Sequence, residues 1–305
     1  MDFYGWLGSI ALILLAGYLL DREIYFYEGV HLGPRVQAWL YDRWAKKYDA
    51  DKRESQLRDD EMLAQPLLEA TSVQFSRTEG WEQGELGGVE PFVLDFATGT
   101  GRLSFALVKR AEFKGRIIAI DISQGMLEKA HEKLAGLDAS GTITPSIRPA
   151  EDARVDFLRH RTFPLPFAEA TFDAVCCLEA LELLPDMDAA LAEFSRVLRP
   201  GGILLTSRGT EESGRKAKVK SAEAFTSLLE ANGFGNVQVV RWWKLFDRVI
   251  AVKNGNSDPV KKRALRDVLR CSNCGNIQWD ETSNALRCES CGNAVPITEV
   301  GIVLN

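Results

Sequence analysis

Histidine and net positive charge are both scarce in this sequence. Its 305 residues include only three histidines, at positions 31, 131 and 160, and none of them follows a predicted strand. A histidine acting as catalytic base is therefore disfavoured. Lysine and arginine number 37 against 43 aspartates and glutamates, which gives a formal net charge of -6. Proteins that bind nucleic acid through its phosphates usually carry a basic excess, so a general nucleic-acid binder is disfavoured too.

Charge is entirely missing from Phe3–Leu20, a run rich in leucine, isoleucine and aromatic residues. As a helix this run is about one bilayer thick. It lacks the preceding lysine or arginine of a secretory signal. We therefore predict a single-pass transmembrane anchor at residues 1–22, with a buried or interfacial helix of the folded domain as the alternative. Basic residues between positions 22 and 47 predict a membrane-anchored protein whose catalytic domain faces the cytoplasm.

The remaining chain, in a sequence that is 46% hydrophobic, is long enough for one full-sized core and smaller appendages. Tryptophans and tyrosines at helical spacing predict amphipathic helix from Val36 to about Ala70. We divide the chain into the anchor, a helical lid and linker at 23–90, a catalytic domain at 91–254, and a basic linker with a cysteine-rich module at 255–305.

Strand and helix signals alternate through the catalytic domain. Short β-rich runs occur at residues 92–95, 116–121, 142–147, 172–177 and 202–207. Such alternation predicts a parallel sheet with crossover helices. Two further runs, at 237–243 and 246–252, lack an intervening helix and should pair antiparallel at one edge. The fold class is therefore α/β, with a doubly wound, mostly parallel seven-stranded sheet, an N-terminal helical segment and a small C-terminal zinc ribbon.

The first strand runs into a glycine turn in Phe92-Val-Leu-Asp95-Phe-Ala-Thr-Gly99-Thr-Gly101. Glycines here let the backbone turn tightly and approach a ligand. A dinucleotide site would prefer a third glycine where this chain has Ser104, and Asp95 would repel a pyrophosphate. An adenosyl amino acid, whose ammonium group needs a partner, fits better.

Further acidic residues follow later strands. Asp121 ends the second strand, where a carboxylate can accept both hydroxyls of a ribose. Asp152, with Ala153 beside it, is predicted to follow the third strand and to accept from an adenine amine. The alternative for each aspartate is a helix N-cap.

Together with Ile118-Ala-Ile-Asp121, Phe172-Asp-Ala-Val-Cys-Cys and Leu198-Arg-Pro-Gly-Gly202, the glycine turn resembles the motifs of class I S-adenosylmethionine-dependent methyltransferases. The D-x-A-T-G-T-G form and the upstream Tyr41-Asp-Arg-Trp-Ala-Lys-Lys-Tyr48-Asp resemble the ubiquinone and menaquinone C-methyltransferases. The resemblance implies that S-adenosylmethionine is bound, with Asp95, Gly99 and Gly101 at its methionine end, Asp121 at its ribose, and Asp152 and Ala153 at its adenine. The remaining donor-site residues that we expect are Ala97, Thr98, Ile122, Met126 and Leu178. Residues 154–163 depart from the family pattern.

The acceptor side carries fewer signals, because methyl transfer from a sulfonium mainly requires alignment of donor and nucleophile. Glu179 and Glu182 follow the fourth strand, where acceptors bind in relatives, and a carboxylate there can take a proton or hold an amine. Solvent-facing acids of a first helical turn are the equal alternative. Tyr41 and Tyr48 are candidates for a lid over the donor, with aromatic packing as the alternative.

Four of the six cysteines form two C-x-x-C pairs, Cys271 with Cys274 and Cys288 with Cys291. This spacing predicts a structural, tetrahedral Zn²⁺ site in a reducing compartment, with a rubredoxin-type iron site as the minor alternative. The surrounding sequence resembles the small zinc-binding activator subunit of several tRNA, rRNA and translation-factor methyltransferases. We expect the module to dock on the catalytic sheet. Its basic linker, residues 261–270, is interpreted either as a lipid-facing or as a solvated segment.

These features predict S-adenosylmethionine-dependent methyl transfer to a small, lipophilic acceptor at the membrane. An RNA or protein methyltransferase is the first alternative, favoured by the zinc module and by the basic loop at 215–220. A non-catalytic, donor-binding scaffold is the second.

Overall fold

The computed structural model describes residues 3–77, 90–135, 155–213 and 219–305. Over these residues the main sheet has eight strands in the order β11-β3-β2-β1-β4-β5-β7-β6. Strands from β11 to β5 run parallel, and β7 is antiparallel to both β5 and β6. The bounds are β1 Phe92–Phe96, β2 Arg116–Asp121, β3 Val155–Arg159, β4 Phe172–Cys177, β5 Leu198–Gly209, β6 Phe234–Trp243, β7 Phe246–Lys253 and β11 Val303–Leu304.

Helices cover both faces of this sheet, and alternate strand residues divide between the two faces. Phe92, Leu94 and Phe96 of β1 belong to one apolar core, whereas Val93 belongs to the other. Helices α7 (Met187–Val197) and α8 (Ala222–Ala231) pack into the first core, and α4 (Gln65–Phe75), α5 (Arg102–Val108) and α6 (Gln124–Ala135) into the second. The doubly wound α/β fold is therefore confirmed, and so is the antiparallel pair β6–β7 at one edge.

Two details of the sheet differ from the prediction. The third strand was predicted at 142–147, which lies outside the described residues, whereas β3 occupies Val155–Arg159. An eighth strand, β11, pairs with the outer edge of β3 through Val303 opposite Leu158 and Leu304 opposite Arg159. Both differences lie at the same edge, where the C-terminal segment extends the catalytic sheet.

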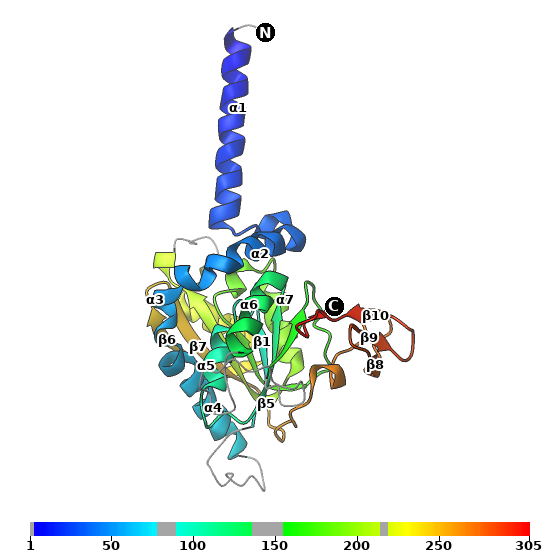
Figure 1. Ribbon diagram of the computed structural model, residues 1–305. Helices are drawn as coiled ribbons and strands as arrows, with labels where there is room; N and C mark the ends of the chain where they lie inside the picture. Colours follow the sequence, from blue (N-terminus) through cyan, green and yellow to red (C-terminus); the bar gives the residue numbers. More distant parts are fainter. Residues whose placement is uncertain (1–2, 78–89, 136–154, 214–218) are drawn as a thin grey trace.

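The N-terminal segment is helical and begins with α1 (Phe3–Asp21), which projects away from the rest of the molecule (Figure 1). The next elements are η1 (Arg22–Phe26), η2 (Val30–Leu32), α2 (Pro34–Asp51), α3 (Arg53–Gln56) and η3 (Asp60–Ala64). Helix α2 lies across the end of the sheet beneath α1 (Figure 1).

The predicted transmembrane anchor at residues 1–22 was wrong. Within the described residues, no helix combines the length and the apolar character needed to span a membrane. Helix α1 has 19 residues and ends on Asp21, whereas a span requires about 20 predominantly apolar residues. The prediction of a single-pass, membrane-anchored protein with a cytoplasmic catalytic domain therefore has no basis in the structure.

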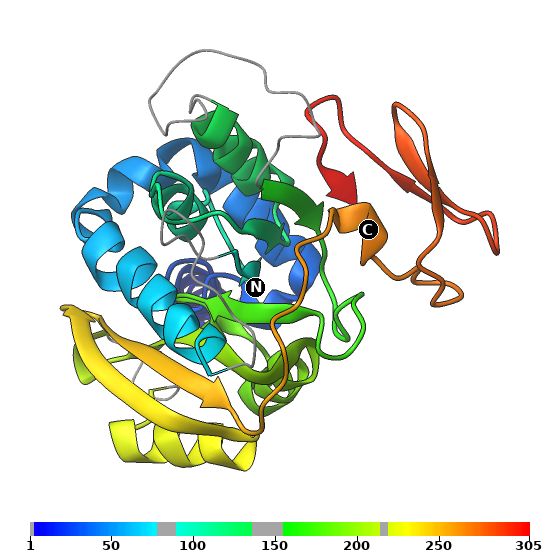
Figure 2. The same ribbon diagram turned by 90° about the horizontal axis from the view of Figure 1, so that it is seen from below.

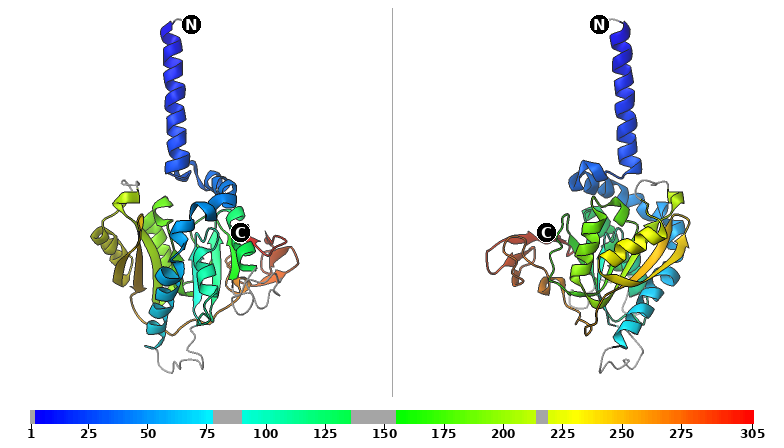
Figure 3. Two further views of the ribbon diagram at one scale, coloured as in Figure 1. Left: turned by 60° about the vertical axis from the view of Figure 1, so that its left-hand side comes forward. Right: turned by 180° about the vertical axis from the view of Figure 1, so that it is seen from behind.

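The C-terminal module carries a three-stranded sheet of β8 (Trp279–Glu281), β9 (Ala285–Cys288) and β10 (Ala294–Pro296). It lies at the sheet edge opposite β6 (Figure 3). The linker after β7 crosses the underside of the sheet to reach it (Figure 2). Backbone amides of Val260 and Leu265 donate to Asp173 and Asp156 along this path, at 3.1 Å each. Residues from the module, among them Leu269, Leu286 and Val303, join the first core, so the module docks on the catalytic domain.

Candidate functional site

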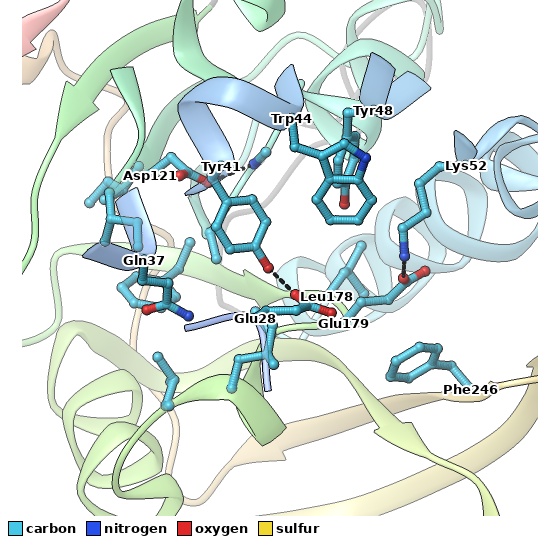
Figure 4. Close-up of a pocket in the computed structure, with 18 of the residues that line it drawn as sticks. Glu28, Gln37, Tyr41, Trp44, Tyr48, Lys52, Asp121, Leu178, Glu179 and Phe246 are labelled. Atoms are coloured by element: carbon cyan, nitrogen blue, oxygen red, sulfur yellow. Dashed lines mark hydrogen bonds and ion pairs between the residues drawn. The ribbon is translucent and has the colours of Figure 1, made fainter. Parts of the chain in front are cut away.

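A pocket opens at the carboxyl ends of β1, β2, β3 and β4, where the strand order reverses between β1 and β4. Ligands of open α/β sheets bind at such a point. The hollow measures about 1020 Å³ including its open mouth. Helix α2 contributes Gln37, Tyr41, Trp44 and Tyr48 to its wall (Figure 4).

The glycine turn after β1 forms one side of the pocket. Ala97 has φ 55°, Gly99 φ 56° and Gly101 φ 73°, all in the left-handed region. A Cβ at Gly101 would also lie 3.0 Å from the Ala130 Cβ of α6. Position 101 therefore requires glycine both for its backbone conformation and for helix packing.

Asp95 holds this turn from beneath instead of lining the pocket. Its Oδ2 accepts hydrogen bonds from the hydroxyls of Thr98 and Ser104, each at 2.7 Å. Burial raises the pKa of Asp95, and the two hydroxyls oppose that shift. The carboxylate thus fixes the backbone amides that the turn presents to a ligand.

Asp121, at the end of β2, lines the pocket directly. Its Oδ2 accepts from the Gly99 backbone amide and its Oδ1 from the Ser123 amide, both at 2.9 Å. Burial raises the pKa of Asp121 to about 6, against the lowering effect of these amides. Each carboxylate oxygen retains a second lone pair, so the residue can still accept hydrogen bonds from a ligand.

The predicted site residues fall into three groups. Those lining the pocket are Ala97, Gly99, Asp121, Ile122, Leu178, Tyr41 and Glu179. Those outside its wall are Asp95, Thr98, Gly101, Met126 and Glu182. Asp152 and Ala153 lie outside the described residues, and β3 begins after them at Val155, so they do not follow this strand.

The residue that does follow β3 is His160, contrary to the expectation that no histidine follows a strand. It lines the pocket, and its backbone amide donates to the Asp121 carbonyl at 3.1 Å. Its Nδ1 lies 3.2 Å from the side-chain Nδ2 of Asn305, the last residue of the chain. Burial lowers the pKa of His160, which favours the neutral ring. The end of the C-terminal strand therefore contacts a residue of the pocket wall.

Two aspartates fasten α2 over the pocket, and the sequence analysis missed both. Asp42 Oδ1 accepts from the Ser123 hydroxyl at 2.6 Å and from the Gly125 amide at 2.8 Å. Asp49 accepts from the Thr100 hydroxyl at 2.5 Å and pairs with Lys133 at 2.9 Å. Their spacing of seven residues, which places both on one helix face, was the available signal.

Glu179 is held in a network of charges at the end of β4. Its two carboxylate oxygens pair with Lys52 at 2.9 Å and with Arg102 at 2.7 Å. Burial alone would raise the pKa of Glu179, but the two cations outweigh it and lower the pKa. The backbone has φ 56°, an unusual conformation for glutamate. Glu182 is buried below the pocket, where its Oε1 accepts from the Gly209 amide at 2.5 Å.

Aromatic and aliphatic side chains make up much of the remaining wall. Tyr41 and Trp44 have ring centroids 5.9 Å apart, and those of Trp44 and Tyr48 are 4.8 Å apart. Burial raises the pKa of Tyr48, and the charge of Glu179 adds to that effect. Phe246 of β7 also lines the pocket (Figure 4). Such a wall suits a flat, apolar ring.

The four cysteines of the C-terminal module converge on one point. Their Sγ atoms all lie within 4.8 Å of one another, with 3.6 Å between Cys271 and Cys291 and 3.5 Å between Cys274 and Cys288. Sulfurs bound tetrahedrally to Zn²⁺ at about 2.3 Å are about 3.8 Å apart. A disulfide would require about 2.05 Å. The cluster therefore has the dimensions of a tetrathiolate metal site.

Residues 94–206 match the profile of the methyltransferase domain. The chain is 28% identical over 182 residues to the ubiquinone/menaquinone biosynthesis C-methyltransferase UbiE of Geobacter sulfurreducens, covering 60% of each protein. It is 32% identical over 176 residues to the demethylmenaquinone methyltransferase of Thermobifida fusca, covering 56% of this chain and 60% of that one. The chain thus spans about three fifths of the length of these relatives.

Among solved structures, a SAM-dependent methyltransferase from Aquifex aeolicus aligns with a TM-score of 0.49 at 22% identity, over 69% of this chain and 97% of that one. The sequence matches and the motifs at the strand ends identify a class I S-adenosylmethionine-dependent methyltransferase domain.

Proposed function

We propose that this methyltransferase domain transfers a methyl group from S-adenosylmethionine to a ring carbon of a small, lipophilic, hydroxylated aromatic acceptor of the quinol class. The observation that carries the proposal is one pocket with two different walls. The polar wall consists of the glycine turn and Asp121, and the apolar wall consists of rings on α2 and β7.

The polar wall supports the assignment of the donor. The ionised Asp121 can accept from ribose hydroxyls, and the turn at Ala97 and Gly99 allows close approach of an amino acid end. His160 is the polar residue that follows β3, and we assign it to the adenine end in place of Asp152. Donor binding at these positions leaves Glu179 and the aromatic residues for the acceptor.

The apolar wall and the relatives support the acceptor class. One relative is named as a ubiquinone/menaquinone biosynthesis C-methyltransferase and another as a demethylmenaquinone methyltransferase. Tyr41, Trp44 and Phe246 contribute aromatic surface to the wall of this pocket. A ring held against them would present a carbon to the sulfonium methyl, and alignment of the two is the main catalytic requirement.

We further propose that Cys271, Cys274, Cys288 and Cys291 hold a structural Zn²⁺ in a module formed by residues 255–305. All four coordination positions would be filled by protein thiolates, so the metal would stabilise the module and take no part in methyl transfer. The module ends in β11, which pairs with β3. A metal that stabilises the module would therefore also stabilise this edge of the sheet, beside His160.

The test is transfer of labelled methyl from S-adenosylmethionine to three pools: reduced demethylated quinones, RNA and protein. We expect label in the quinol pool, and no methylated product when the donor is omitted. Label in RNA or protein alone would assign one of those substrates instead. Donor binding without label in any pool would identify a non-catalytic scaffold.

A further inference from the structure

A positively charged side chain, Lys52, lies in the wall of the pocket and has no assigned role. It comes directly after α2, and its ammonium pairs with Glu179 Oε2 at 2.9 Å (Figure 4). The Lys52 side chain is 24% exposed. Of the described residues that line the pocket, Lys52 alone is a lysine or arginine. It is therefore the residue to consider for binding a negatively charged oxygen in this wall.

The position of the Lys52 ammonium is fixed through Glu179. The other carboxylate oxygen, Glu179 Oε1, accepts from Arg102 at 2.7 Å. Arg102 in turn pairs with Asp59 at 2.6 Å and donates to the Ser55 carbonyl at 2.6 Å. All three nitrogens of this guanidinium are thus hydrogen-bonded within the protein. Because Arg102 holds one oxygen of Glu179 in place, the other oxygen holds the ammonium at one point of the pocket wall.

The Lys52 ammonium can bind a ligand without leaving Glu179. An ammonium has three N–H donors. Within the described part of the chain, the hydrogen bond that Lys52 donates goes to Glu179, and its ammonium also lies 5.8 Å from the ring centroid of Tyr48. The carboxylate of Glu179 interacts with two cations, which lower its pKa, so it stays ionised beside the ammonium. Lys52 therefore keeps both its charge and donors for an oxygen of a bound ring.

We propose that Lys52 binds the hydroxyl oxygen of the acceptor and stabilises its ionised form, with Glu179 as the residue that positions the ammonium. This inference rests on the proposed function. A charge-assisted hydrogen bond from a cation favours the ionised form of a hydroxyl and so lowers the pKa of that hydroxyl. The ionised oxygen donates electron density into the ring, which makes a ring carbon more nucleophilic.

The reaction that follows needs only the donor and solvent water. The hydroxyl proton passes to water when the acceptor binds. The ring carbon forms a bond to the methyl group as the methyl–sulfur bond breaks and sulfur takes its electron pair. Loss of the ring proton to water restores aromaticity, and the oxygen regains a proton from water when the product leaves. The products are the methylated ring, S-adenosylhomocysteine and one proton.

The first measurement is the pKa of a hydroxyl in the pocket. The probe is 1-naphthol, whose ionised form absorbs at longer wavelength, bound to the protein with saturating S-adenosylhomocysteine. We compare wild type with Lys52→Met, with Lys52→Arg, and with the control Lys47→Met, which alters an exposed lysine of α2. Lys52→Met should raise the pKa of the bound naphthol by about one unit, and the other two variants should match wild type. Equal values in wild type and Lys52→Met, or a naphthol that wild type does not bind, would overturn the inference.

The second measurement is kcat on a series of hydroquinones of graded hydroxyl pKa at one assay pH. For weakly acidic members we expect kcat of Lys52→Met to fall by about 10- to 100-fold, and Lys52→Arg to recover most of that loss. Members already ionised at the assay pH should lose about threefold or less, because they need no help to ionise. A deficit that stays constant along the series would leave Lys52 a structural role and overturn the inference alone. A wild-type protein that binds the donor but methylates no member would overturn the proposed acceptor and this inference together.

Discussion

The hydrogen bonds of Asp42 allow the role of α2 as a cover to be tested. This carboxylate is half-buried and accepts from Ser123 and Gly125, which begin the segment after Asp121. A Cβ at Gly125 would lie 3.1 Å from the Asp42 Cα, so helix and turn are in close contact there. Changing Asp42 to alanine removes both bonds and should favour an open pocket.

The two bonds involve a charged acceptor, and together they should contribute about 2 kcal/mol at a half-buried position. If α2 must cover the donor for tight binding, losing this energy should raise the donor Kd by about 30-fold, because 1.4 kcal/mol corresponds to a factor of ten. Asp42→Asn keeps an acceptor oxygen and should give an intermediate value. Lys46→Ala, an exposed change on the same helix, should give the wild-type value.

The assay is isothermal titration of S-adenosylmethionine into each variant, with a thermal melt to show that the fold is intact. Limited proteolysis should cut Asp42→Ala near α2 faster than wild type without donor, and at a similar rate with saturating donor. An Asp42→Ala protein that melts normally and binds the donor within about threefold of wild type would refute the covering role.

Three further predictions follow from the donor turn and the cysteine cluster. Because the pKa of Asp121 is about 6, its carboxyl is protonated below that pH, so donor affinity should fall by up to about tenfold per unit below pH 6 and stay level above it; a titration with the same slope in Asp121→Asn would contradict this. Gly101→Ala combines a left-handed backbone, φ 73° and ψ 34°, with a 3.0 Å contact to Ala130, so denaturant melts should show a loss larger than the about 1–2 kcal/mol of the backbone conformation alone; a loss within that range would exclude the packing contribution. Cys288→Ser should lower the thermal midpoint of the whole protein by about 5 °C or more, because the cysteine module also contains β11, which belongs to the main sheet. An unchanged midpoint would show that the module does not contribute to the stability of the catalytic domain.

Most of the sheet could be predicted because its strands are continuous apolar runs bounded by turns. Strand β3 could not be predicted in this way, because its sequence includes two charged residues, Asp156 and Arg159. Asp156 pairs with Arg116, and Arg159 donates a hydrogen bond to Gln124. The β-branched run at 142–147 was the stronger local signal. Strand β11 spans only two residues, which is too short for any periodicity to indicate it.

The donor side of the site was accessible to sequence reasoning because each residue follows a strand. Asp121 and the glycine turn can be located once the strands are known. The covering side was not accessible, because Asp42 on α2 forms its hydrogen bond with Gly125, 83 residues further along the chain. The transmembrane prediction for residues 1–22 was wrong because it relied on the apolar composition of this run. An apolar run at the lower length limit does not by itself define a membrane span.

The central claim is that the strand ends at Gly99, Asp121 and His160 hold an adenosyl sulfonium beneath α2. The most direct test is a crystal structure of the protein with S-adenosylhomocysteine bound. We predict ribose hydroxyls on the Asp121 carboxylate, the amino acid end against the glycine turn and the adenine beside His160. A ligand bound elsewhere, or saturating ligand that leaves this pocket empty, would contradict the account.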